Sequence, residues 1–249
     1  CLSTATFIGA HQSIGANAIF LGGSEYLKKK YLVPLAEGRM VGAFALTEVL
    51  AGSDSFNLRT KAVKDGDHWV LNGEKMWITN GNIADVVSVF ARTERGITGF
   101  VVETKWKGYE AGAPEKKMGI RGSATSSIAL QDVQVPAENM LGEDGRGFIV
   151  AMKTLDAGRL GLGAACTGAA KELLELSAQY AKTRKQFDVP SAQFEAIQWM
   201  LAEMATTIYA MESLVYRTAH DYEAGEPISR QSAMVKLFCS EGLSEVADK

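Results

Sequence analysis

Two short stretches of the 249-residue sequence decide its fold and its site: A-L-T-E-V-L-A-G-S-D at residues 45–54 and M-W-I-T-N-G at residues 76–81. Each stretch belongs to a run of apolar, β-branched and aromatic residues that is typical of a strand. Hydroxyl, backbone N–H and aromatic groups are therefore expected at the ends of two strands. That arrangement suits a flat ring with polar edges.

The second stretch is predicted to lie on a β-hairpin. Residues 68–71 and 75–79 are rich in Trp, Val, Ile and Thr and would form its two strands. Asn72-Gly73 between them is a favoured pair for a turn in which both residues need positive φ. Trp77 and Thr79 are two residues apart on the second strand, so they are expected to point to the same face.

The hydrophobic period changes twice along the chain, which predicts an α+β fold in three parts. Residues 1–40 have the helical period and are expected to form the end of a helical domain. Residues 41–142 have the period of two that is typical of a β domain, and residues 143–249 return to the helical period of a bundle. The strands expected in the middle part are residues 42–46, 61–64, 68–71, 75–79, 86–91, 98–103 and 126–130.

The clearest helical seam lies in the last part, where apolar residues recur three and four positions apart. Its members are Phe194, Ile197, Leu201, Met204, Ile208, Met211 and Val215. An antiparallel neighbour is expected to present Ala169, Leu173, Leu176, Tyr180 and Phe187. Residues 188–191 would form the loop between these helices, and Gly225-Glu226-Pro227 would end the second one.

The composition is that of an ordinary globular protein and excludes several classes of function. The chain is 47% hydrophobic with a formal net charge of -3, so nothing in it indicates a nucleic-acid surface. No apolar run approaches the roughly 20 residues of a membrane-spanning helix. The scattered cysteines and histidines lack the spacing of a disulfide framework, a metal site or a catalytic triad. These residues are Cys1, Cys166, Cys239, His11, His68 and His220.

The order of these motifs resembles the acyl-CoA dehydrogenase family, flavoenzymes that desaturate acyl thioesters. Further segments continue the resemblance in family order along most of the chain. They are K-M-G-I-R at residues 117–121, the run at residues 130–136, D-A-G-R at residues 156–159, R-K-Q-F at residues 184–187 and the helix from Phe194. The resemblance implies a helical N-terminal part (residues 1–40), a middle β domain (41–142) and a C-terminal helical bundle (143–249). It also implies that the chain is a central portion, with further helices on both sides.

The resemblance implies that the ring is the flavin of FAD and assigns contacts to it. The backbone of Leu46 and the hydroxyl of Thr47 would bond the ring edge, with Phe44 packed nearby. Trp77 would lie against the ring and Thr79 would bond near its N5 atom. A strand-ending Thr and a core Trp are the structural alternatives.

Charged and small polar residues complete the implied site. Arg184 would bond the flavin pyrophosphate, often that of a neighbouring subunit, for which a guanidinium fork is suited. Ser53 would contact the CoA portion of the substrate, and Asp156 and Arg159 would make substrate or active-site contacts. A serine turn and solvent-exposed arginines on a helix are the alternatives.

The implied reaction needs a carboxylate that removes the α-proton while the β-hydride goes to the flavin. Most family members carry this Glu far towards the C-terminus, and a minority carry it immediately before the arginine that matches Arg159. That position is Gly158 here, which has no side chain. The resemblance therefore places no general base in this chain and predicts a Glu beyond Lys249.

Three departures from the family pattern affect the expected site. Val49-Leu50 replaces a segment with Pro, which predicts a looser turn. Asp188 stands where the pattern has Gly. Glu195 stands where a Gln commonly bonds the flavin diphosphate region, and a carboxylate there would repel a pyrophosphate.

The function implied is an FAD-dependent acyl-CoA dehydrogenase of fatty acid β-oxidation. It would form a trans-2-enoyl-CoA and pass electrons to electron-transfer flavoprotein. An acyl-CoA oxidase-like relative and a divergent non-catalytic scaffold or assembly subunit with the same fold are the alternatives. The resemblance further implies a homodimer or homotetramer in a bacterial cytoplasm or a mitochondrial matrix.

Overall fold

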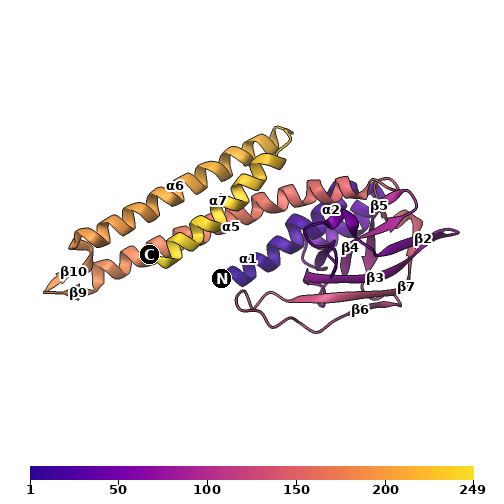
Figure 1. Ribbon diagram of the computed structural model, residues 1–249, viewed down its shortest axis with the longest axis horizontal. Coiled ribbons are helices and arrows are strands. Elements are labelled where there is room, and N and C mark those ends of the chain that lie inside the picture. Colours follow the sequence, from indigo (N-terminus) through magenta and orange to yellow (C-terminus); the bar gives the residue numbers. More distant parts are fainter. The chain divides into compact units, whose positions relative to one another are not determined.

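The computed structural model describes residues 1–249 and divides by its internal contacts into two units, Cys1–Gly158 and Arg159–Lys249. Helix α5 (Gly147–Thr183) begins in the first unit and ends in the second (Figure 1). The contacts group the first helices with the sheet, so the domain boundaries expected near residues 40 and 142 stay a prediction. None of the helices is long and apolar enough to cross a membrane.

Helical segments occupy the first 36 residues, as the period predicted. They are α1 (Leu2–Gly9), η1 (Ala10–Ala16), α2 (Asn17–Gly22), α3 (Glu25–Leu27), η2 (Lys28–Leu32) and α4 (Val33–Ala36). The expected strands follow, with two short ones, β6 and β8, that the period did not reveal. The strands are β1 (Gly42–Ala45), β2 (Lys61–Asp65), β3 (His68–Thr79), β4 (Val86–Thr93), β5 (Gly96–Glu103), β6 (Tyr109–Ala111), β7 (Thr125–Pro136) and β8 (Met140–Leu141).

The strands form one mixed sheet in the order β6-β7-β3-β2-β4-β5-β8, with β1 added in parallel to β4. Alternation on β4 explains how the sheet is covered. Val87 and Val89 pack into a core shared with strands of the sheet, while Val86 and Phe90 pack into a second core with the helical segments. Burial on both faces accounts for the nearly continuous apolar sequence of this strand.

The hairpin expected at Asn72-Gly73 is wrong, because β3 runs without a turn from His68 to Thr79. The turn lies earlier, at Gly66 (φ 58°), where Asp65 of β2 pairs with His68. Asn72 instead exchanges hydrogen bonds with Asp132 of β7, in both directions at 2.9 Å. Gly73 is needed for another reason: a Cβ there would lie 2.5 Å from Thr60 Oγ1.

The second unit contains the end of α5 with α6 (Glu195–Glu223) and α7 (Ser229–Asp248) (Figure 1). Three members of the predicted seam, Met204, Ile208 and Met211, are buried, while Phe194 precedes α6 as its N-cap residue. The core of the unit comprises Cys166, Ala170, Met204, Ile208, Met211, Val235, Cys239 and Val246.

The neighbour expected for the seam is only partly correct. Leu173 packs against the core, but Leu176, Tyr180 and Phe187 are exposed. The buried face of α5 passes instead through Ala170 and Leu174, four residues apart, so the sequence spacing was assigned to the wrong face.

The connection between α5 and α6 is a small hairpin, β9 (Lys185–Gln186) and β10 (Val189–Pro190), rather than a plain loop. Phe187 (φ 50°) and Asp188 (φ 62°) form its two-residue turn, and both have left-handed backbone. This explains why Gly is favoured at residue 188 and why Asp, which tolerates that conformation, is an acceptable replacement.

Candidate functional site

The two sequence motifs meet in the first unit, where the segment after β1 contacts β3. Met76 N–H donates to the Thr47 carbonyl at 2.9 Å. The Lys75 ammonium donates to the Leu46 carbonyl at 3.1 Å and to Glu48 Oε1 at 2.8 Å. Three contacts therefore fix residues 46–48 against the strand that carries Trp77 and Thr79.

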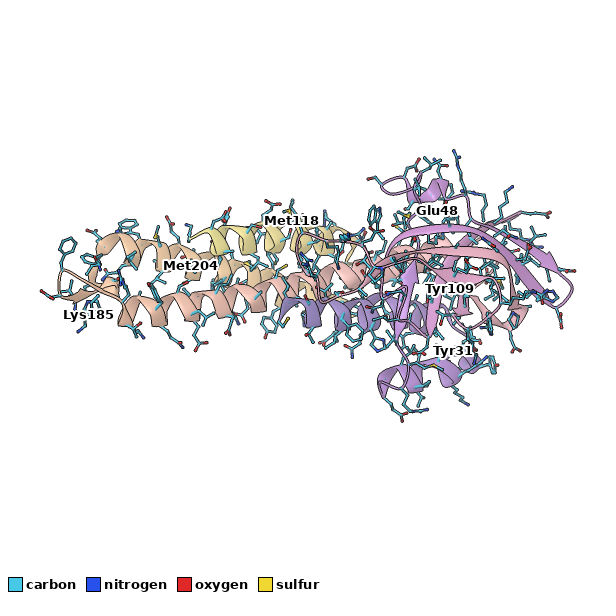
Figure 2. The ribbon with its side chains drawn as sticks, turned by 90° about the horizontal axis from the view of Figure 1, so that it is seen from below. Tyr31, Glu48, Tyr109, Met118, Lys185 and Met204 are labelled. Carbon is cyan, nitrogen blue, oxygen red and sulfur yellow. The ribbon has the colours of Figure 1, made fainter.

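Glu48 is held from its other side by residues 59 and 60. Its carboxylate accepts from the backbone N–H groups of Arg59 (2.6 Å) and Thr60 (2.9 Å) and from the Thr60 hydroxyl (2.6 Å). Figure 2 shows the segment around Glu48 well apart from the helical segment that carries Tyr31. Glu48 is thus a buried structural anchor, a role that the sequence did not indicate.

Burial and pairing set the protonation of this pair. Burial alone would raise the pKa of Glu48, but Lys75 and the donors from Thr60 and Arg59 lower it below its usual value. Burial lowers the pKa of Lys75 from 10.5 to about 8, because it outweighs the attraction of Glu48. Lys75 has no exposed surface, so its ammonium interacts only with groups inside the protein.

The buried pair predicts a dependence of stability on pH. Glu48 has a lowered pKa when folded, so its contribution is present above about pH 4.5 and is lost as the pH falls through the folded value. Lys75 loses its proton near pH 8 when folded but near 10.5 when unfolded, so the unfolded state binds more protons between these values and stability rises with pH. The free energy of unfolding should be measured for the wild type and for a Lys75→Met/Glu48→Gln double variant. A difference between them that stays constant with pH contradicts this expectation.

The turn at Val49-Leu50 is not loosened by the missing proline. Glu48 N–H donates to the Ala51 carbonyl at 3.1 Å, and Ala51 N–H donates to the Glu48 carbonyl at 3.2 Å. Val49 and Leu50 are exposed at the tip of this closed turn. Ser53 follows on the exposed side, so its hydroxyl is accessible to a ligand.

Trp77 lies on a β-bulge and not on a regular strand. Between Lys75 and Ile78 the register with β7 shifts by one residue, and Trp77 has φ 60°. The period-two argument for a common face with Thr79 therefore does not apply at Trp77. Exposure still distinguishes Trp77 and Thr79 from Ile78, which lies between them. Ile78 is 2% exposed, whereas Trp77 is 60% exposed and Thr79 is partly exposed. Left-handed backbone at a bulky residue is unfavourable and is concentrated at functional sites.

Thr79 ends β3 opposite Thr125 of β7, and the next residue fixes this end of the strand. Asn80 is fully buried with φ 66°, and its Nδ2 donates to the carbonyls of Phe7 (3.3 Å) and Gly42 (3.5 Å). Its Oδ1 is buried without a partner, as is Ser126 Oγ. Asn80 thus ties the end of β3 to α1 and β1.

The side chains of Phe44 and Leu46 are buried beside the junction of the two motifs, and their roles toward a cofactor stay a prediction. The Phe44 ring is buried against Phe90, with 5.0 Å between ring centroids, and the Leu46 side chain is also buried. The Leu46 carbonyl already accepts from Lys75. Both side chains therefore pack in the core beside the site, and the Phe44 ring has little exposed surface.

Asp156 and Arg159 are three residues apart on α5, and both are partly buried. They lie on either side of the boundary between the two units, and their roles toward the substrate stay a prediction. Gly158 between them is closed to a side chain, because a Cβ would lie 2.7 Å from Ile14 Cγ2.

We expect Gly158→Ala to lower the free energy of unfolding by about 1–3 kcal/mol, because the added methyl forces Ile14 to move. Gly168→Ala is the matched control on the same helix, since its Cβ would meet nothing within 4 Å. The control should be neutral or stabilising, as Ala favours helix over Gly. Chemical denaturation of both variants measures the effect, and equal stabilities would contradict the close contact with Ile14.

Arg184 and Glu195 lie in the second unit, at the two ends of the β9-β10 hairpin. The Arg184 side chain is exposed, and its carbonyl accepts from Ser191 N–H at 2.7 Å. Glu195 begins α6 and accepts from Trp199 Nε1 at 3.2 Å. A carboxylate in the first turn of a helix is favoured by the helix dipole, which is a structural reason for Glu195.

The groups left open at the junction of the two motifs fit one side of a flavin. Trp77 offers an exposed aromatic surface, and Thr47 and Thr79 are partly exposed residues whose hydroxyls make no side-chain hydrogen bond within the chain. Sequence reasoning missed Lys75 and Asn80, which hold this junction together. The alternation along β3 could have indicated a buried Lys75, because Lys75 lies an even number of residues from the buried Trp69 and Leu71.

Models of three acyl-CoA dehydrogenase domains match the chain in order: the N-terminal domain at residues 1–39, the middle domain at 43–133 and the C-terminal domain at 145–249. The chain is 42% identical over 254 residues to the short-chain specific acyl-CoA dehydrogenase of Clostridium acetobutylicum, covering 100% of this chain and 67% of that protein.

Solved structures agree with these matches. One is described as the electron transferring flavoprotein of Acidaminococcus fermentans, with a TM-score of 0.96 and 43% identity over 99% of this chain and 66% of that one. Another is an acyl-CoA dehydrogenase from Bacillus anthracis complexed with FAD, with a TM-score of 0.93 and 41% identity over 99% of this chain and 46% of that one.

The fold and the site together define a protein with a helical N-terminal part, a β middle part with an open aromatic edge and a helical C-terminal part. The chain belongs to the acyl-CoA dehydrogenase family. It spans about two thirds of the length of the Clostridium acetobutylicum relative.

Proposed function

We propose that the complete protein is an FAD-dependent acyl-CoA dehydrogenase that converts an acyl-CoA to its trans-2-enoyl-CoA. The observation that carries the proposal is the open edge at the end of β3. There the exposed Trp77, held in left-handed backbone, lies two residues from the unengaged hydroxyl of Thr79. Three contacts bring residues 46–48 to the same strand.

In this proposal FAD, when bound, would supply the acceptor for the β-hydride, and electron-transfer flavoprotein would take up the electrons. Trp77 would cover the ring, the Thr79 hydroxyl would bond near N5 and the Thr47 hydroxyl would bond the ring edge. Arg184 would pair with the flavin pyrophosphate, often that of a neighbouring subunit, for which its exposed guanidinium is suited. Likeness to an FAD complex supports the cofactor, and 41% identity to the CarC subunit of the caffeyl-CoA reductase-Etf complex of Acetobacterium woodii supports the partner.

We propose that Ser53, Asp156 and Arg159 contact the acyl-CoA and that a Glu beyond Lys249 removes the α-proton. The exposed hydroxyl of Ser53 follows Gly52, where a Cβ would meet nothing within 4 Å, which leaves room for a pantetheine or phosphate. The packing of Ile14 against Gly158 supports a base elsewhere in the protein. A homodimer or homotetramer is proposed from the family. Buried free thiols at Cys166 and Cys239 support a reducing compartment, either a bacterial cytoplasm or a mitochondrial matrix.

The visible absorption spectrum of the full-length protein tests the proposal, first as purified and then without oxygen after addition of short, long and branched acyl-CoAs. A flavin band that bleaches with one class of acyl chain supports the dehydrogenase and identifies its substrate class. Rapid reoxidation by oxygen would favour an oxidase instead. A protein that retains no flavin and rebinds none would contradict the proposal and favour the scaffold.

A further inference from the structure

Besides its ion pair with Glu48, Lys75 makes a hydrogen bond to a backbone carbonyl that is not needed to balance its charge. Its side chain has no exposed surface, and its ammonium bonds one group on each side of Thr47: the Leu46 carbonyl at 3.1 Å and the Glu48 carboxylate at 2.8 Å. The next backbone N–H, that of Met76, donates to the Thr47 carbonyl itself. Every link in this group therefore fixes the position of Thr47.

Lys75 also lies close in sequence to the other two open groups, Trp77 and Thr79. The residue lies directly before the bulge that turns Trp77 outward, and four residues before Thr79. A shift of residues 46–48 against β3 would therefore change the spacing between Thr47 and both other open groups. Three ligand contacts on one rigid ring depend on that spacing.

A direct chemical role is excluded by burial, because a side chain without exposed surface cannot touch a substrate. A role in stability alone does not explain the arrangement well either. Buried ion pairs contribute little net stability relative to apolar side chains of similar volume. The bond to the Leu46 carbonyl has a positional consequence that an apolar side chain could not reproduce.

We propose that Lys75 is a positioning residue for the cofactor: its ammonium holds residues 46–48 in the arrangement in which Thr47, Trp77 and Thr79 bind one flavin ring. This inference rests on the proposed function. It concerns the geometry of the binding edge and assigns Lys75 no part in proton or hydride transfer.

Two variants of the full-length protein separate positioning from stability. The double variant Lys75→Met/Glu48→Gln removes both charges together, so no unpaired charge stays buried, but Met cannot bond the Leu46 carbonyl. The single variant Glu48→Gln removes the negative charge but keeps a side-chain oxygen that can accept from Lys75, and the bond of Lys75 to the Leu46 carbonyl remains. Lys61→Met on β2 is the control, since Lys61 is an exposed lysine on the strand next to β3.

The measurements are the dissociation constant of FAD from the apoprotein, by fluorescence titration, and the midpoint of thermal unfolding of the same sample. We expect the double variant to unfold near the wild-type temperature and yet to bind FAD roughly tenfold more weakly, the size of one lost buried hydrogen bond. Glu48→Gln should unfold at a lower temperature and bind FAD within about twofold of the wild type. Lys61→Met should change neither.

FAD affinity that follows the unfolding temperature in both variants would overturn the inference, since it would reduce Lys75 to a structural residue. If the double variant does not fold, Glu48→Gln still decides, because a parallel loss of affinity and stability there contradicts positioning. Wild-type protein that binds no FAD would overturn the proposed function and this inference with it. Wild-type protein that binds FAD and is reduced by acyl-CoA, with normal affinity in the double variant, would overturn only the inference.

Discussion

Replacement of Glu48 by alanine is expected to lower the free energy of unfolding by about 3–5 kcal/mol, the usual result of removing one partner of a buried ion pair. The carboxylate is 8% exposed and accepts hydrogen bonds from Lys75, Arg59 and Thr60. Alanine leaves the Lys75 ammonium buried and retaining only the Leu46 carbonyl. The backbone N–H groups of residues 59 and 60 lose their acceptor as well.

Equilibrium denaturation of the full-length protein, with its cofactor removed, measures this effect without a contribution from ligand binding. Glu74→Ala is the matched control, because Glu74 is an exposed glutamate on β3 directly before Lys75. The control should change stability by less than about 0.5 kcal/mol. A loss below about 1 kcal/mol for Glu48→Ala would show that the pair is not the anchor described above.

Replacement of Thr79 by alanine is expected to slow reduction of the flavin by acyl-CoA by about tenfold to a hundredfold. This is the range for one hydrogen bond to a group that gains charge in the transition state. The Thr79 hydroxyl makes no side-chain hydrogen bond within the chain, so stability should change little. A slower reduction rate with unchanged stability would therefore show that the hydroxyl contacts the ligand and is not needed for folding.

Rapid mixing of oxidised protein with acyl-CoA in the absence of oxygen gives the reduction rate, and thermal unfolding gives the stability. Thr79→Ser keeps the hydroxyl and should retain most of the rate, which makes it the matched control. An unchanged rate in Thr79→Ala would remove the role assigned to this hydroxyl. A matching loss of rate in Thr79→Ser would assign the effect to packing instead.

Much of the architecture could be predicted from the sequence because its signals are local. Three parts with helical, β and helical periods were expected and are present. The seam through Met204, Ile208 and Met211 was also correctly identified as buried. The sequence predictions were wrong where a local pattern indicated one structure and contacts with a distant segment of the chain produced another. Asn72-Gly73 has the composition of a tight turn, yet bonds from Asp132 and the close approach of Thr60 keep it inside a strand.

The candidate site was only partly predictable for the same reason. Thr47, Trp77 and Thr79 were recognised as open groups from their motifs, and the structure leaves all three at least partly exposed. Phe44 packs against Phe90, and its role beside the cofactor stays a prediction. The bulge at Trp77 could not be foreseen, because it depends on the register between β3 and β7.

The sequence by itself determined the order of the main elements and the family, because period and motif are written in neighbouring residues. Tertiary structure alone decided how the groups of the candidate site are held. Lys75 meets Leu46 and Glu48 across separations of 29 and 27 residues, and Asn80 meets Phe7 across 73. Such contacts follow from the packing of strands and helices, which the residues on either side of each partner do not encode.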